Sequence, residues 1–99
     1  MEIKIFVPLV SDKTKATKRF IKAILKEFGG YTVIKAKGYW LNPETNKTEI
    51  DKIEVFEILL VNHREDTQAI IENELKKLKI ALAQKSILYS INGEPFFIE

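Results

Sequence analysis

The order of strand-like and helix-like segments is the feature that most constrains the fold of this chain. Residues 2–9 alternate apolar and polar side chains, which is typical of a half-buried strand. Residues 14–28 and 67–84 instead repeat their apolar side chains with the period of a helix. Seven segments are predicted in chain order: strand 2–9, helix 14–28, strand 31–41, strand 50–62, helix 67–84, strand 86–91 and strand 94–98.

This order contains two successive βαβ units, which is the ferredoxin-like pattern when the sheet is antiparallel. Right-handed crossovers place the first and third strands in the centre, the second at one edge and the fourth beyond the first. Asn92-Gly93 predicts a tight hairpin to a fifth strand, where Pro95 is tolerated at a sheet edge. We therefore predict one α+β domain over residues 1–99. It is a ferredoxin-like βαββαβ sandwich with an extra C-terminal hairpin strand and two helices on one face of an antiparallel sheet.

The first predicted helix has a row of cations opposite its apolar stripe. At about 100° per residue, one arc holds Lys15, Lys18, Arg19, Lys22 and Lys26. The opposite arc holds Thr17, Phe20, Ile21, Ile24, Leu25 and Phe28. The row predicts a docking surface for nucleic-acid phosphates or an acidic protein, and the alternative is a solvated lysine-rich face.

The charge of the chain is divided between its two halves. Residues 1–48 have 10 Lys/Arg against 4 Asp/Glu, whereas residues 49–99 have 6 against 10. The net charges of +6 and −4 give the +2 of the whole chain. A near-neutral total argues against coating of nucleic acid, and the split favours either local docking onto an acidic partner or contact between the halves of neighbouring subunits.

The composition excludes several classes of protein. The 99 residues include no cysteine, which removes disulfides, thiolate metal sites and a cysteine nucleophile. The N-terminal residues lack the pattern of a signal peptide, and the apolar run Ile58–Val61 is too short to span a membrane. We predict a cytoplasmic protein with no membrane partner.

No catalytic motif is present, and the candidate catalytic groups are few. The sequence has no P-loop, no G-x-G-x-x-G, no H-E-x-x-H and no G-x-S-x-G. His63 is the single histidine, and it is either a weak candidate general base or a surface residue in a turn. Glu49, Asp51 and Glu57 share one alternation face, where they either hold Mg²⁺ or form the solvent side of a strand. We predict no metal and no cofactor.

Several apolar residues lack a place in a core formed by two helices on one sheet face. An apolar sheet face or edge strand left exposed favours pairing with a second chain. The sequence therefore predicts a homodimer, in which Phe6 is on the open sheet face and self-association involves Phe56, Ile58, Leu60, Phe96 and Phe97. The alternative is that Phe96 and Phe97 cover the core of their own chain.

Two short stretches resemble the motifs of RNA-recognition domains. Ile5-Phe6-Val7 with Leu9 is similar to the first-strand motif of that family, and Lys37-Gly38-Tyr39-Trp40 is similar to its second motif. The resemblance implies stacking of bases on sheet aromatics. The family has its second motif on the third strand, whereas here the match is on the second.

The element order and size also resemble the Cas2-type small nucleases of CRISPR systems. Residues 6–12, Phe-Val-Pro-Leu-Val-Ser-Asp, are similar to the first strand and loop of that family. The resemblance implies a dimeric, metal-dependent nuclease. Pro8 and Leu9 occupy the position of the family's metal-binding aspartate, and Asp12 follows later.

A third resemblance is to small uncharacterised proteins of bacteria and mobile elements. Its signature is Phe28-Gly29-Gly30-Tyr31-Thr32, then Gly38-Tyr39-Trp40 and Glu49, which covers about a quarter of the chain. The signature implies a glycine that ends a helix directly before a strand, and no activity.

Two function classes follow from the sequence. The first is a non-enzymatic dimeric module for binding or assembly. The second is an enzyme, either cofactor-free and of the dimeric α/β-barrel type or a Cas2-like nuclease. A deep pocket near Tyr39, Trp40 or His63 favours the enzyme, whereas a filled core and flat surfaces favour the module.

Overall fold

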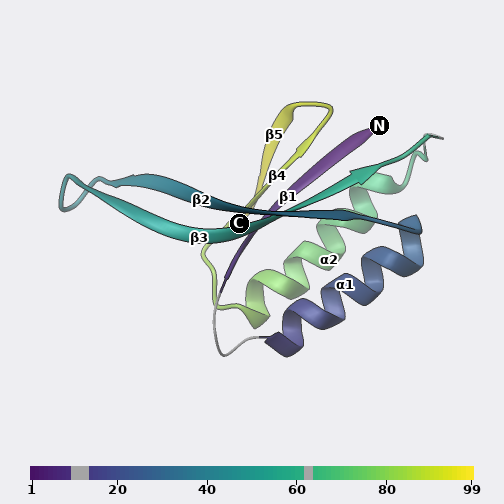
Figure 1. Ribbon diagram of the computed structural model, residues 1–99, viewed down its shortest axis with the longest axis horizontal. Coiled ribbons are helices and arrows are strands. Elements are labelled where there is room, and N and C mark those ends of the chain that lie inside the picture. Colours follow the sequence, from purple (N-terminus) through teal and green to yellow (C-terminus); the bar gives the residue numbers. More distant parts are fainter. Residues whose placement is uncertain (10–13, 62–63) are drawn as a thin grey trace.

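The computed structural model describes residues 1–9, 14–61 and 64–99 as a sheet with a pair of helices on one side (Figure 1). The elements are β1 (Glu2–Pro8), α1 (Thr14–Phe28), β2 (Thr32–Asn42), β3 (Lys47–Leu59), α2 (Thr67–Ala81), β4 (Ile87–Ile91) and β5 (Glu94–Ile98). The sheet is antiparallel throughout, with strand order β2-β3-β1-β4-β5. The predicted α+β class, with two helices and five antiparallel strands, is confirmed.

The core lies between the sheet and the two helices. Ile3 and Ile5 of β1 face Ile58 and Phe56 of β3 across the ladder, and all four are almost completely buried. The Phe20 ring of α1 meets the Phe56 ring edge-on, with 5.6 Å between centroids. The helical period predicted for residues 67–84 is confirmed, because Ile71, Leu75, Leu78 and Leu82 form one buried stripe.

Turn residues end the elements where the sequence places them. Gly29 follows α1 with φ of 82°, and its N–H donates to the Leu25 carbonyl at 2.9 Å. Asn92 and Gly93 have φ of 50° and 83°, as the predicted type I′ turn requires. Asp66 occupies the N-cap position of α2 without a side-chain cap bond, because its carboxylate instead accepts hydrogen bonds from Arg64 at 3.1 Å.

The β2–β3 hairpin extends beyond the helices as an arm (Figure 1). Its strands stay paired from Thr32–Glu57 to Asn42–Lys47, so β3 begins and ends three residues earlier than predicted. Asn42 closes the turn, since its side-chain oxygen accepts the Glu44 N–H at 2.9 Å. The arm therefore has two faces that α1 and α2 do not cover.

The structure corrects the predicted self-association surface. Phe56 and Ile58 are each 1% exposed, so both belong to the helix-side core and cannot meet a second chain. Leu60 and Phe96 pack against the same core, and the Phe96 ring stacks on Tyr89 at 5.3 Å. Phe97 alone of the five is exposed, at 56%. The run 58–61 is apolar at every position, so the sequence alone could not show which alternate residues face the helices.

Several large apolar residues outside the core are exposed. Ile80 of α2 is 78% exposed, on the face of the helix away from its buried stripe. In the apolar run 58–61, Leu59 is 67% exposed and Val61 99%. Leu25 is also on the border of the α1 stripe, at 44% exposure. Along the described residues, no helix is long and apolar enough to cross a membrane.

Candidate ligand cavity

An apolar row crosses the sheet on the face that the helices leave open. Each strand contributes one residue in direct cross-strand register: Ile34, Val55, Phe6, Leu88 and Phe97. None of these five side chains belongs to the helix-side core. The row thus forms a second apolar surface, separated from the first by the thickness of the sheet.

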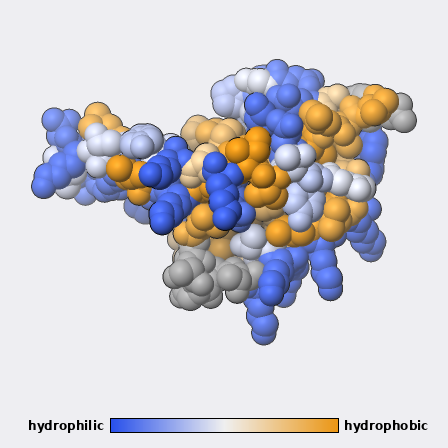
Figure 2. All heavy atoms as spheres, viewed as in Figure 1, coloured by the Kyte–Doolittle hydropathy of each residue, from blue (hydrophilic) through white to orange (hydrophobic). Residues whose placement is uncertain are grey.

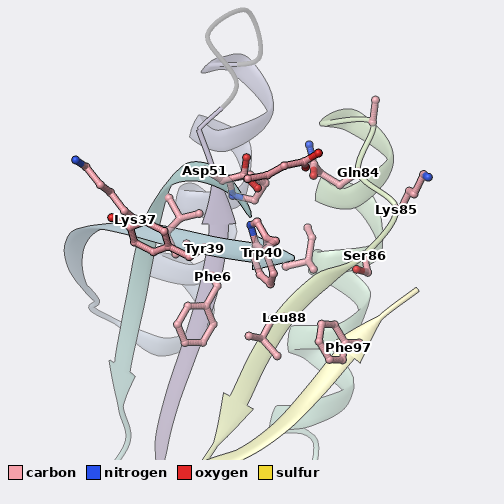
Figure 3. Close-up of a pocket in the computed structure, with 16 residues that line it drawn as sticks. Phe6, Lys37, Tyr39, Trp40, Asp51, Gln84, Lys85, Ser86, Leu88 and Phe97 are labelled. Carbon is pink, nitrogen blue, oxygen red and sulfur yellow. The ribbon is translucent and has the colours of Figure 1, made fainter. Parts of the chain in front are cut away.

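The arm forms one wall above this floor. Gly38 and Trp40 of β2 lie on the open face, directly opposite Asp51 and Glu49 of β3. The Asn42 side chain donates its amide N–H to Glu49 Oε1 at 2.8 Å and so orients that carboxylate. Figure 3 shows the Trp40 indole and the Asp51 carboxylate among the residues that line the cavity, with Phe6 and Leu88 below them in that view.

Trp40 depends on the glycine two residues before it. A Cβ atom added at Gly38 would lie 3.3 Å from Trp40 Cζ2 and 3.5 Å from Trp40 Nε1. The indole therefore lies flat along the strand, over the position where any other residue would have its side chain. Glycine at position 38 allows the ring to form the wall of the cavity.

The second wall follows the end of α2. Ala83 takes a left-handed conformation, with φ of 53°, and directs residues 84–86 back toward β4. Gln84, Lys85 and Ser86 line the cavity from this side. Floor and walls border an open-sided cavity of about 620 Å³, a volume typical of small-molecule sites.

The lining predicts the chemistry of a ligand. Aromatic rings from Phe6, Trp40 and Phe97 offer surfaces for a planar group. The carboxylates of Glu49 and Asp51 attract a cation or accept hydrogen bonds from hydroxyl groups. Lys85 lies at the rim of the opening, where its amino group is within reach of an anion. Within the described ranges, no group of three or more His, Cys, Asp or Glu side chains could hold a metal ion.

The structure separates the residues that sequence reasoning had selected. The five cations from Lys15 to Lys26 are exposed on α1, on the other side of the sheet from the cavity. Of the three carboxylates on one alternation face, Glu49 and Asp51 line the cavity and Glu57 does not. His63 lies outside the described residues, as does Asp12.

Sequence reasoning found the rings beside the cavity but missed its floor. Tyr39 and Trp40 were the residues expected near a pocket in an enzyme, and the cavity does lie beside them. Leu88 and Phe97 were missed, although each has the alternation phase of Phe6 on its neighbouring strand. In residues 5–7 and again in 87–89, the middle side chain points to the face opposite its two neighbours. This alternation is the signal that could have identified the floor of the cavity.

Comparison with solved structures finds the same fold. No family model and no curated protein matches the sequence. A phage SAM lyase in complex with S-methyl-5'-thioadenosine matches over 98% of this chain and 87% of its own, with a TM-score of 0.70 and 15% identity. A phage SAM lyase in the apo state matches over 98% and 86%, with the same score and identity. At this identity the likeness shows the fold alone.

Proposed function

We propose that the chain is a ferredoxin-like domain that binds S-adenosylmethionine, or a close adenosyl sulfonium compound, in the cavity of the open sheet face. The observation that supports this most directly is the composition of the cavity, where an aromatic floor and wall meet two carboxylates within about 620 Å³. A purine is planar and stacks on rings such as Trp40 and Phe97. A sulfonium is a cation, which carboxylates and aromatic faces both attract.

The polar groups of the cavity match the remaining parts of such a ligand. The Glu49 carboxylate, oriented by Asn42, can accept hydrogen bonds from ribose hydroxyls or attract the sulfonium. Lys85, at the rim of the cavity, can bind the ligand's own carboxylate. The fold that the chain shares with phage SAM lyases is consistent with this ligand class.

The activity that we propose for the loaded cavity is loss of S-methyl-5'-thioadenosine from S-adenosylmethionine. The bond between the sulfonium sulfur and the methionyl γ-carbon breaks, and its electron pair stays on sulfur, which becomes a neutral thioether. The carbon fragment is completed either by loss of a β-proton to a cavity carboxylate, Glu49 or Asp51, which forms a carbon–carbon double bond, or by attack of the ligand's own carboxylate on the γ-carbon, which forms a lactone. Neither route consumes water or a cofactor, so a cavity made of protein side chains is sufficient.

Trp40 gives a direct test, because it is the only tryptophan in the chain. We expect S-adenosylmethionine to change the protein's fluorescence in a saturable way below about 1 mM, which is a binding free energy beyond about −4 kcal/mol. Trp40→Phe removes the signal, and calorimetry then checks binding. Absence of saturable binding by both methods contradicts the proposal.

The role of the two carboxylates in binding a cationic ligand can be tested separately. Glu49→Gln with Asp51→Asn should weaken binding of cationic S-adenosylmethionine by about tenfold, or about 1.4 kcal/mol, and should hardly change binding of neutral S-methyl-5'-thioadenosine. Chromatography of the same mixtures measures formation of the thioether. Binding without product identifies a binding protein, whereas product formation that the double variant abolishes identifies a lyase.

A further inference from the structure

The outer side of the helical layer is a separate, strongly basic surface. Lys15, Lys18, Arg19, Lys22 and Lys26 are all exposed along α1. Figure 2 shows hydrophilic side chains projecting from the lower edge of the molecule, where Figure 1 places α1. At about 1.5 Å per residue, the row from Lys15 to Lys26 is about 16 Å long. A straight row of this length lies along several phosphates of a nucleic acid.

The carboxylates of the helices do not neutralise this row. The two helices contain eight cations, Lys15, Lys18, Arg19, Lys22, Lys26, Lys76, Lys77 and Lys79, against only three carboxylates, Glu27, Glu72 and Glu74. Each carboxylate has another partner: Glu27 meets Arg64 at 3.7 Å, Glu72 accepts the Tyr89 hydroxyl at 2.6 Å, and Glu74 meets Lys77 at 3.4 Å. Among the described residues, no ion pair involves the row itself.

Arg64 keeps Glu27 away from the row. Its guanidinium lies between Glu27 and Asp66, and it also donates to the Glu27 carbonyl at 3.1 Å, at the end of α1. The hydrogen bond and charge of Arg64 lower the pKa of Asp66, which therefore stays ionised. The one carboxylate on α1 is thus held at the helix end, and the cations of the middle turns remain available.

The chemistry of the surface distinguishes between polyanionic partners. The apolar residues of α1, such as Phe20 and Ile24, are buried against the sheet and cannot enter a bilayer. Protein–protein interfaces have an apolar centre, whereas among the described residues of α1 Leu25 is the single exposed large apolar residue at the border of the row. A surface made almost wholly of cations fits a partner that offers a regular row of phosphates.

We propose that the cationic face of α1, residues 15–26, docks on the phosphodiester backbone of nucleic acid. This function is separate from the cavity, because the sheet lies between the two surfaces. Contacts to phosphate alone give binding without sequence preference and with a strong dependence on salt.

A salt titration with matched variants tests the proposal. Binding of a labelled DNA duplex should weaken by about 40- to 500-fold between about 50 and 200 mM salt, which corresponds to three to five phosphate contacts. Lys18→Glu with Lys22→Glu should weaken binding by more than about tenfold and reduce the salt slope by about two. The control Lys47→Glu with Lys52→Glu makes the same change in net charge on the sheet, where both lysines are exposed, and should keep the slope.

The outcomes separate the alternatives. Equal loss in both double variants shows an effect of net charge and overturns the proposal, as does binding without salt dependence. Tighter binding to phosphatidylserine vesicles or polyglutamate, at equal concentration of charge, overturns it in favour of another partner. Circular dichroism checks folding, and the milder Lys15→Gln with Lys26→Gln provides a second test. S-Adenosylmethionine binding should be unchanged in the α1 variants, so failure of one proposal leaves the other intact.

Discussion

Both faces of the sheet have an apolar row, yet the two rows have different roles. On the helix side, Ile5, Phe56 and Tyr89 stand side by side in register and are at most 1% exposed. On the open side, the next row along the strands ends in Ile34 and Phe97, which are 49% and 56% exposed. The comparison teaches that apolar alternation shows only that two faces exist. Which one holds the fold together depends on where the helices pack.

The largest expected effect comes from comparing one phenylalanine on each face of the sheet. Phe56→Ala removes a ring at the centre of the core and should lower the free energy of unfolding by about 3–5 kcal/mol. Phe97→Ala removes a half-exposed ring and should cost less than about 1 kcal/mol. Urea denaturation measures both values. Similar losses in the two variants would show that the open face also stabilises the fold.

The hydroxyl of Tyr89 allows a smaller change to be tested in the core on the helix side. It donates to Glu72 at 2.6 Å and accepts from Gln68 at 3.1 Å, although the residue is fully buried. Tyr89→Phe leaves the ring and removes these bonds, so we expect a loss of about 1–2 kcal/mol in the free energy of unfolding near pH 7.

The same hydroxyl predicts a dependence on alkaline pH. Burial, followed by the bond to Glu72, raises the pKa of Tyr89 from 10.0 to about 12. A group whose pKa is higher in the folded state contributes stability that is complete below the unfolded pKa. The contribution is therefore present below pH 10 and disappears as pH rises toward about 12. Tyr89→Phe should lose less stability than the wild type over this interval, and parallel curves would contradict the assignment.

These residues also show how far the sequence alone could predict the structure. Local signals were sufficient for α1, for the Asn92-Gly93 turn and for the buried stripe of α2, because each depends on residues close together in the chain. The alternation phase of β3 was not predictable in the same way. Residues 53, 55, 56 and 58 are all apolar, and only the pairing with Ile5 assigns Phe56 to the helix side.

The cavity was only partly predictable for a similar reason. The sequence placed Glu49 and Asp51 on one face of a strand, and this follows from alternation alone. It could not bring residues 83–86 to the same opening, because their position depends on where α2 ends and on the left-handed Ala83. The division of charge between the two halves of the sequence was also incomplete, since the acidic half contributes Lys76, Lys77 and Lys79 to the helical layer.

Substitutions on the open face should weaken ligand binding, although they hardly change the stability of the fold. Phe97→Ala should weaken S-adenosylmethionine by about fivefold, close to 1 kcal/mol, because the cavity loses part of its floor. Leu25→Ala is the control, since Leu25 is 44% exposed on α1, on the other side of the sheet from the cavity, and should leave the affinity unchanged. Calorimetry measures both. Equal affinity in wild type and Phe97→Ala would remove the open face from the site.

The smallest expected effect is at Gly38, where the arm meets the cavity. Its φ is not in the left-handed region, so alanine is allowed by the backbone, and the added Cβ meets only the Trp40 ring at 3.3 Å. Gly38→Ala should therefore move the indole by a few tenths of an ångström and change stability by less than about 1 kcal/mol. Because Trp40 is the only tryptophan, its emission spectrum reports the displacement directly. We expect about threefold weaker binding, near 0.6 kcal/mol, together with a shifted emission maximum. A shifted maximum with unchanged affinity would place Trp40 outside the ligand contact, whereas Gly30→Ala, a glycine with no heavy atom within 4 Å of its added Cβ, should change neither.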